Sequence, residues 1–201
     1  QPMLTRRAGL IEAVKVALVR DGEFFDWLEK NVRGLLSLNE ATLEEAVQRS
    51  AVHHARHIAQ GGDPFELGSS RPLDYGHWAA HKLEQLTDFE LSHGEAVSVG
   101  VSLDTLYAAR VGLLEAVDAE RVLKLIEGLE LPIWHEALEL KDQKGRRRVF
   151  NGLEEFREHL GGELTVLLLK ETGVGVDVHE IDETIWEECA NELKARALSM
   201  V

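Results

Sequence analysis

The sequence predicts a mainly α-helical domain with a small β-hairpin near its C-terminus. Apolar residues recur at three- and four-residue spacing through most of the 201 residues, which is typical of helices with one buried face. Only the stretch 164–181 has the β-branched, alternating pattern of strands. No linker-like tract or change in composition divides the chain, so we expect residues 1–201 to form one domain.

The first part of the chain is expected to contain three helices. Asn39 is a candidate N-cap for the third, and Thr42 with Glu45 three residues later forms a candidate capping box. Two glycines and a proline in 61–64 disfavour its continuation. The first two helices are predicted from the apolar spacing of Leu4, Ala8, Ile11 and Leu18, and of Phe25, Leu28, Val32 and Leu35.

The remaining pattern predicts further helices and one hairpin. Strands 164–169 and 174–181 are separated by Thr172 and Gly173, a pair typical of a tight turn. The basic segment 141–148 is interpreted as a solvated loop, with attraction of an anionic substrate as the alternative. The expected helices cover residues 73–86, 92–110, 116–130, 132–140, 150–160 and 182–198.

Charge and cysteine usage exclude several classes of protein. Lys+Arg 22 against Asp+Glu 36 gives a net charge of −14, so the overall field repels nucleic acid and anionic membranes. The lone Cys189 allows neither an internal disulfide nor a zinc site built from cysteines. No run of about 18 apolar residues is present, as a membrane-spanning helix would need. A cytoplasmic protein without a nucleic-acid or membrane partner is expected.

Histidine spacing indicates where chemistry could occur. His77 and His81 stand one helical turn apart and project from one face, as two ligands of a divalent metal do. His53 and His57 have the same spacing. A partly buried polar face is the alternative for either pair.

Glu12 and Lys15 form a second candidate pair on an otherwise small and apolar helix face. They are either a surface ion pair, or a carboxylate for a metal and an ammonium for an anion. His93 precedes a run of small residues that allows close helix packing, which suits a buried position, and spacing alone leaves its role open.

Three motifs in order resemble those of the 3-dehydroquinate synthase family. Residues 76–84 read GHWAAHKLE, residues 91–97 read LSHGEAV, and residues 7–15 read RAGLIEAVK. They resemble the family's Gly-His-x-x-x-His-x-x-Glu, Leu-x-His-Gly-Glu-Ala-Val and Gly-Leu-x-Glu-x-x-Lys segments at matching intervals. The resemblance covers nearly the whole chain and weakens after about residue 110. It implies the helical C-terminal domain of that fold.

The resemblance also implies roles for particular residues. Glu12, His77 and His93 match the three ligands of the catalytic divalent metal, which is usually zinc, with cobalt or iron as alternatives. Lys15 matches a lysine that contacts the substrate, and His81 matches a histidine near the transferred phosphate.

Several positions depart from the family pattern, and all of them concern substrate recognition. Arg56 stands where a catalytic lysine is common, and Asp74 replaces an asparagine before Gly-His. The expected arginine aligns with Ser70, with Arg71 one place later as the candidate substrate-binding residue. Trp78-Ala79-Ala80 replaces Thr-Phe-Gly. These changes are similar to those of the wider sugar phosphate cyclases, including the 2-epi-5-epi-valiolone synthase branch.

The family's NAD-binding domain precedes its helical domain, and no part of this chain resembles it. Gly173-Val174-Gly175 is only a fragment of a dinucleotide fingerprint, so we assign no cofactor-binding residue. We therefore expect a metal- and substrate-binding half that needs NAD on a separate domain and is inactive alone. The resemblance further implies a homodimer that converts a sugar phosphate to a carbocycle by eliminating phosphate. The alternatives are a glycerol dehydrogenase-like alcohol dehydrogenase and a non-catalytic helical dimerisation domain.

Overall fold

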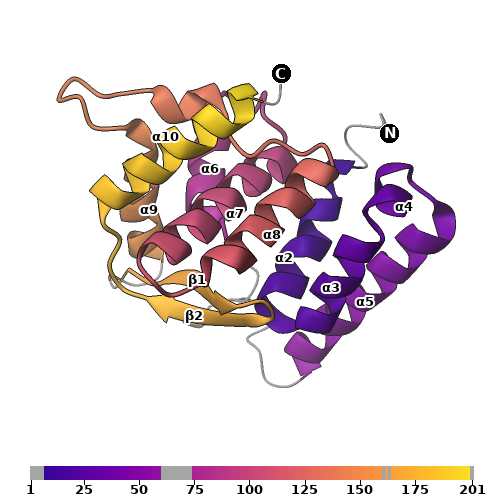
Figure 1. Ribbon diagram of the computed structural model, residues 1–201. Helices are drawn as coiled ribbons and strands as arrows, with labels where there is room; N and C mark the ends of the chain where they lie inside the picture. Colours follow the sequence, from indigo (N-terminus) through magenta and orange to yellow (C-terminus); the bar gives the residue numbers. More distant parts are fainter. Residues whose placement is uncertain (1–6, 60–73, 160–161, 163, 200–201) are drawn as a thin grey trace.

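Helices arranged around one central helix make up most of the molecule, with a two-stranded hairpin at one end (Figure 1). The computed structural model describes residues 7–59, 74–159, 162 and 164–199. No helix within these ranges is long and apolar enough to cross a membrane. The elements are α2 (Leu10–Arg20), α3 (Gly22–Lys30), α4 (Val32–Leu36), α5 (Glu40–Ala59), α6 (His77–Leu86), α7 (His93–Arg110), α8 (Ala116–Gly128), η1 (Glu136–Glu139), η2 (Arg148–Phe150), α9 (Asn151–His159), β1 (Val166–Glu171), β2 (Val174–Val178) and α10 (Glu183–Ser199).

Helix α7 is the central element of the core. Its residues 96–108 are all buried, and it packs against α2, α6, α8, α10 and β1. Most residues of α7 are apolar or small, with Asp104 as a buried exception, as is typical of a helix covered all round. The mainly helical fold class expected from the sequence is confirmed.

Side-chain caps explain where two of the expected helices begin. Asn39 accepts a hydrogen bond from the backbone N–H of Thr42 at 3.1 Å, which confirms it as the cap of α5. The proposed box between Thr42 and Glu45 is wrong, because both lie inside α5 and Glu45 instead accepts from Arg49 at 2.6 Å. Ser92 and Glu95 form a capping box that starts α7.

The hairpin forms where the pattern changes from helical to strand-like. Strands β1 and β2 pair antiparallel, with Val166 opposite Val178 and Leu168 opposite Val176. Gly173 has a φ of 91° at the turn, a conformation that glycine adopts without steric cost. The inward side chains of β1 pack against α7 and α2, which secures the hairpin to the helices.

Three expected helices differ from the prediction. The one expected through Phe25, Leu28, Val32 and Leu35 is divided into α3 and α4, because Asn31 leaves the helical conformation with φ −110° and ψ 12°. The helix expected from residue 73 starts only at His77, because Gly76 has a left-handed φ of 78°. The expected helix 132–140 is reduced to the 3-10 turn Glu136–Glu139, whose N-terminus is capped by the ring of His135.

The basic segment 141–148 is only partly a solvated loop. Residues 141–145 are exposed as expected. Arg147, however, is 5% exposed and donates to the carbonyl of Leu138 at 2.9 Å and to Asn191 at 2.6 Å. Arg146 pairs with Glu183 at 2.6 Å. The prediction is wrong for these two arginines, because their charge holds the loop against α10.

Candidate functional site

Glu12, His77 and His93 lie together at the N-terminal ends of three helices. Glu12 lies in the first turn of α2, while His77 and His93 are the first residues of α6 and α7. One potential ligand atom from each lies within 4.8 Å of the other two. The rings of His77 and His93 have centroids 5.4 Å apart, and Nε2 of His93 lies 3.9 Å from Oε1 of Glu12.

Glycines allow the three backbones to approach closely enough for this cluster. A Cβ atom on Gly94 would lie 2.3 Å from the carbonyl oxygen of Ala8, at the start of α2. A Cβ on Gly100 would lie 2.0 Å from the carbonyl oxygen of Gly76, just before α6. Both distances are far inside van der Waals contact, so each position requires a residue without a side chain.

Lys15 joins the cluster from the next turn of α2. Its side chain is 2% exposed, and its ammonium lies 2.7 Å from Oε2 of Glu12 and 3.4 Å from Nε2 of His77. Glu12 and Lys15 do form an ion pair, which lies beside the histidines with Lys15 buried and the side chain of Glu12 45% exposed. The ammonium is placed to attract an anion that reaches this cluster.

His77 is held as a neutral imidazole. Burial, together with the nearby charge of Lys15, lowers the pKa of His77 to about 3. Its Nδ1 lies 3.2 Å from the carbonyl oxygen of Tyr75, which can only accept, so Nδ1 carries the proton. The lone pair of His77 is therefore on Nε2, the nitrogen that faces Lys15 and the cluster.

Glu84 is a member of the site that the sequence analysis did not assign. Its carboxylate lies 3.2 Å from Nδ1 of His93 and 3.2 Å from Nδ1 of His81. An ionised carboxylate only accepts, so it selects the tautomer of His93 that leaves Nε2 available toward Glu12. The signal was present in the sequence, since Glu84 follows His81 by three residues on the same helix face.

His93 is less buried than its small neighbours suggested. Its side chain is 47% exposed, because it stands at the first position of α7 while the burial of that helix begins at Ala96. His81, Glu84 and His93 form a second group with ligand atoms within 4.8 Å of one another. The two groups share His93, through opposite nitrogens.

The other predicted residues lie at varying distances from the cluster. The ring of His81 is 5.3 Å from that of His77. Asp74 is half-buried, and its carbonyl accepts from the N–H of His77 at 2.9 Å. Arg56 is exposed on α5, and among the described residues no hydrogen bond or ion pair joins it to the cluster. Arg71 and Ser70 lie outside the described residues.

The pair His53 and His57 gives no comparable group within the described part of the chain. His53 interacts with Asp21 at 2.8 Å, and its ring stacks on Phe24. The side chain of His57 lies outside the description. The polar-face alternative therefore accounts for His53.

Two hollows are lined by residues of the two ligand groups. One, of about 370 Å³, is lined by Asp74, Trp78, His81 and Glu84, with α9 as its far wall. The other, of about 700 Å³, lies between α2 and α5 and includes Glu12 in a mainly apolar lining. A ligand in the first hollow could contact His81 and Glu84, and a ligand in the second could contact Glu12.

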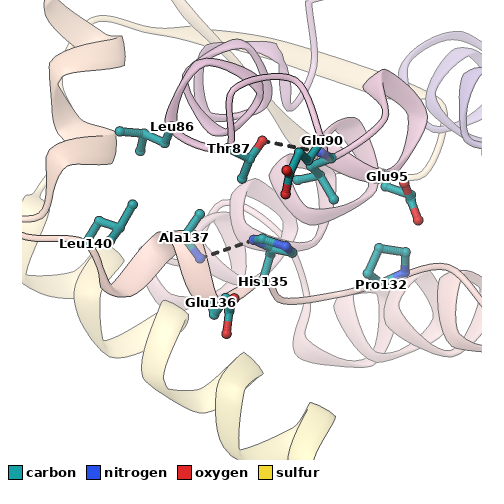
Figure 2. Close-up of a pocket in the computed structure, with 10 residues that line it drawn as sticks. Leu86, Thr87, Glu90, Glu95, Pro132, His135, Glu136, Ala137 and Leu140 are labelled. Atoms are coloured by element: carbon teal, nitrogen blue, oxygen red, sulfur yellow. Dashed lines mark hydrogen bonds between the residues drawn. The ribbon is translucent and has the colours of Figure 1, made fainter.

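A third hollow, shown in Figure 2, lies away from this cluster. It has a volume of about 700 Å³ and is bounded by the α6–α7 connection and the segment 132–140. His135 is engaged with the N–H of Ala137, and Thr87 accepts from the N–H of Leu91. Among the described residues, none of the site residues predicted from the sequence lines it.

Comparison with known proteins identifies relatives over most of the chain. A family model described as 3-dehydroquinate synthase C-terminal matches residues 9–147. A 3-dehydroquinate synthase of Acinetobacter baumannii is 33% identical over 182 residues, which cover 90% of this chain and 48% of that protein. One from Xanthomonas oryzae pv. oryzae is 36% identical over 137 residues, covering 65% and 36% respectively. The chain thus spans about half the length, or less, of the curated relatives it matches.

Solved structures show the same fold. The 2-epi-5-epi-valiolone synthase of Streptomyces hygroscopicus subsp. jinggangensis, with NAD⁺ and Zn²⁺ bound, is 26% identical with a TM-score of 0.85, over 98% of this chain and 53% of that one. A 2-deoxy-scyllo-inosose synthase complexed with carbaglucose-6-phosphate, NAD⁺ and Co²⁺ is 19% identical with a TM-score of 0.69, over 96% and 53%. Because the family match covers more than half of the chain, including all three clustered residues, the chain belongs to the 3-dehydroquinate synthase family.

Proposed function

We propose that residues 1–201 are the metal- and substrate-binding half of a sugar phosphate cyclase, a carbon–oxygen lyase that eliminates phosphate from its substrate. The observation that carries the proposal is the convergence of Glu12, His77 and His93 within 4.8 Å. Membership of the 3-dehydroquinate synthase family supports the reaction class. The departures at Asp74 and Trp78 leave the identity of the sugar phosphate open.

The residues of the cluster fit a divalent cation. Oε1 of Glu12 is buried and has no hydrogen-bond partner. Burial of a carboxylate oxygen without a partner costs free energy, and a bound cation would offset that cost. Glu12, His77 and His93 would hold the ion as one carboxylate and two neutral imidazoles, a donor set typical of catalytic zinc. Bound there, zinc, cobalt or iron would polarise a substrate oxygen as a Lewis acid.

The surrounding side chains would orient the substrate. Lys15 presents a buried ammonium at the inner edge of the cluster and would neutralise an oxygen that gains negative charge. In its imidazolium form, His81 would donate from both ring nitrogens, through Nδ1 to Glu84 and through Nε2 to a phosphate oxygen. Asp74 would select among sugar hydroxyls, since it is an acceptor where relatives have an amide. Arg56 and Arg71 stay predictions as further substrate contacts.

The complete reaction needs a component outside this chain. NAD on a separate domain would supply the hydride chemistry that exposes a carbonyl next to the carbon that is to be deprotonated. This chain would bind the substrate, exclude water and place Lys15 and His81 beside the groups that change charge. We therefore propose that the 201 residues alone bind metal without turnover. The homodimer and the cytoplasmic location stay predictions.

Metal analysis of the purified chain tests the site. We expect about one zinc or similar ion per chain, lost in His77→Ala and in His93→Ala because each removes one of three protein ligands. His179→Ala is the matched control, since His179 is exposed beyond the hairpin and belongs to neither ligand group. Absence of metal from the wild-type chain, or equal loss in all three variants, would contradict the proposal.

Activity of the whole protein separates the cyclase from a dehydrogenase. With the NAD-binding domain present, a cyclase releases inorganic phosphate from a sugar phosphate with no net change in NAD. Net NADH formation without phosphate release would instead support the glycerol dehydrogenase-like alternative. A whole protein that binds no metal and turns over none of the substrates would favour the non-catalytic helical domain.

A further inference from the structure

A buried carboxylate on α7 contacts both neighbours of His77. Asp104 is 1% exposed, in the middle of α7. Its Oδ2 accepts a hydrogen bond from the N–H of Gly76 at 3.2 Å, and its Oδ1 accepts from Nε1–H of Trp78 at 3.0 Å. The two donors therefore flank His77 in the sequence, one on the backbone before it and one on the side chain after it.

This contact satisfies one backbone donor at the start of α6. Gly76 occupies the N-cap position with a left-handed φ of 78° and has no side chain that could cap the helix. Asp104 reaches across from α7 and accepts a hydrogen bond from the N–H of Gly76 itself, one of the four N–H groups at the start of α6 that no helical carbonyl meets. The indole of Trp78 is fixed at the same time, with its ring 5.3 Å from that of Trp186.

A second link from α7 fixes the residue before Gly76. The hydroxyl of Tyr75 lies 2.6 Å from Oγ1 of Thr105, and the carbonyl of Tyr75 accepts from Nδ1 of His77 at 3.2 Å. Neighbouring residues of α7, Asp104 and Thr105, thus hold the segment 75–78 at three points. His77 is the residue of this segment that faces Glu12 and His93.

We propose that Asp104 is a positioning residue for the metal site, which accepts from Gly76 and Trp78 and so holds the imidazole of His77 toward Glu12 and His93. The proposal rests on the metal site proposed above. It adds a residue outside the three sequence motifs, in the middle of α7.

The chemistry of Asp104 indicates a role that an apolar core residue could not fill. Burial raises the pKa of Asp104 to about 7, while the two hydrogen bonds favour its ionised form. A carboxyl group in such surroundings costs stability unless its oxygens are satisfied. Two donors from one short segment satisfy both oxygens, so the residue defines the position of that segment and not only its packing.

The substitution Asp104→Asn tests this role with little change in shape. Both partners are donors, so the amide can accept from one of them while its NH₂ group must face the other. We expect the affinity for Zn²⁺, measured by competition with a chromophoric chelator, to fall by about 10- to 100-fold, as for other residues that orient metal ligands. The visible absorption of the Co²⁺-loaded chain should change in shape, because His77 meets the ion at a different angle.

Trp78→Phe tests whether Asp104 acts through its contact with the indole. Without the indole N–H, the amide oxygen that Asp104→Asn introduces can accept from Gly76, while the NH₂ group no longer faces a donor. Asp104→Asn should therefore cost less than about threefold in Zn²⁺ affinity in the Trp78→Phe background. Equal costs in both backgrounds would overturn the proposal, since the two residues would then act independently.

A destabilised control separates positioning from loss of stability. Leu123 is 3% exposed on α8, and Leu123→Ala lowers core stability without touching the segment 75–78. If Leu123→Ala and Asp104→Asn weaken Zn²⁺ binding equally, Asp104 has only a structural role and the positioning proposal fails alone. If the wild-type chain binds no Zn²⁺ or Co²⁺, the proposed metal site fails with it.

Discussion

Both imidazoles of the Glu12–His77–His93 cluster are oriented through their outer nitrogen. The carbonyl of Tyr75 accepts a hydrogen bond from Nδ1–H of His77, and the carboxylate of Glu84 accepts one from Nδ1–H of His93. Each hydrogen bond leaves Nε2 as the nitrogen with a lone pair, and both Nε2 atoms lie on the side of Glu12 and Lys15. The tautomers needed for metal binding are therefore set by neighbours before any ion arrives.

Glu84→Gln should weaken metal binding while leaving all three ligands in place. The amide can present its NH₂ group to Nδ1 of His93, which favours the tautomer with the proton on Nε2. We expect a loss of about 10- to 100-fold in Zn²⁺ affinity, measured by chelator competition. Glu90→Gln, in the connection between α6 and α7, is the matched control. Retention of full affinity by Glu84→Gln would show that His93 does not need this acceptor.

At the scale of elements, α7 is the helix that sets the positions of the other two. It meets α2 through Gly94 and Ala8, and the start of α6 through Gly100 and Gly76. Each contact joins backbone to backbone, so the distances between the helices do not depend on flexible side chains. The positions of the three candidate ligands are fixed in the same way, because each lies within four residues of one of these backbone contacts.

Gly100→Ala should disrupt the site through the backbone. The new methyl group would lie 2.0 Å from the carbonyl oxygen of Gly76, so α6 must move away from α7. We expect a loss of roughly 1–3 kcal/mol in the free energy of unfolding, as overpacking usually costs, together with weaker Zn²⁺ binding. Denaturant titration and chelator competition measure the two effects.

Gly128→Ala is the control for the helix substitution itself. Its Cβ would lie 3.0 Å from a methyl group of Val32, a side chain that can shift, and alanine favours the helix. We expect unchanged metal binding and equal or higher stability. Equal behaviour of the two alanine variants would contradict the assigned role of the Gly76–Gly100 contact.

At the scale of the whole molecule, Asp104 should make the stability of the metal-free chain depend on pH. The titratable neighbours that share its surroundings are Tyr75, Tyr107 and Cys189, and burial raises the pKa of each, so all three are neutral near pH 7. The pKa of Asp104 is about 7 in the folded chain and near 3.8 in the unfolded one. Folding therefore favours the protonated form.

The sign of the pH effect follows from this difference. The stabilisation is fully present below about pH 4 and is lost as the pH rises through about 7. Between pH 5 and 8 the free energy of unfolding of the wild-type chain should fall by roughly 1–3 kcal/mol relative to that of Asp104→Asn, whose side chain cannot titrate. Urea titrations of both chains in EDTA at several pH values measure this; parallel pH curves would contradict it.

The sequence predicted most elements because their signals are local. Apolar spacing located α7 and α8, the cap at Asn39 located α5, and the change to strand-like alternation located the hairpin. The family motifs selected Glu12, His77 and His93 before any geometry was known. One error arose because a distant element decided the outcome, since α10 contacts Arg147 and helps to bury it in a segment that was predicted to be solvated.

The sequence by itself determined the fold class, the family and the identities of the three candidate ligands. All three depend on spacing along the chain, which local periodicity and motifs record. Only the tertiary structure decided how those ligands are oriented, through Glu84 on the neighbouring turn of α6 and Asp104 across the α6–α7 contact. The physical reason is that hydrogen bonds and pKa values depend on distance and burial in space, and residues far apart in sequence supply both.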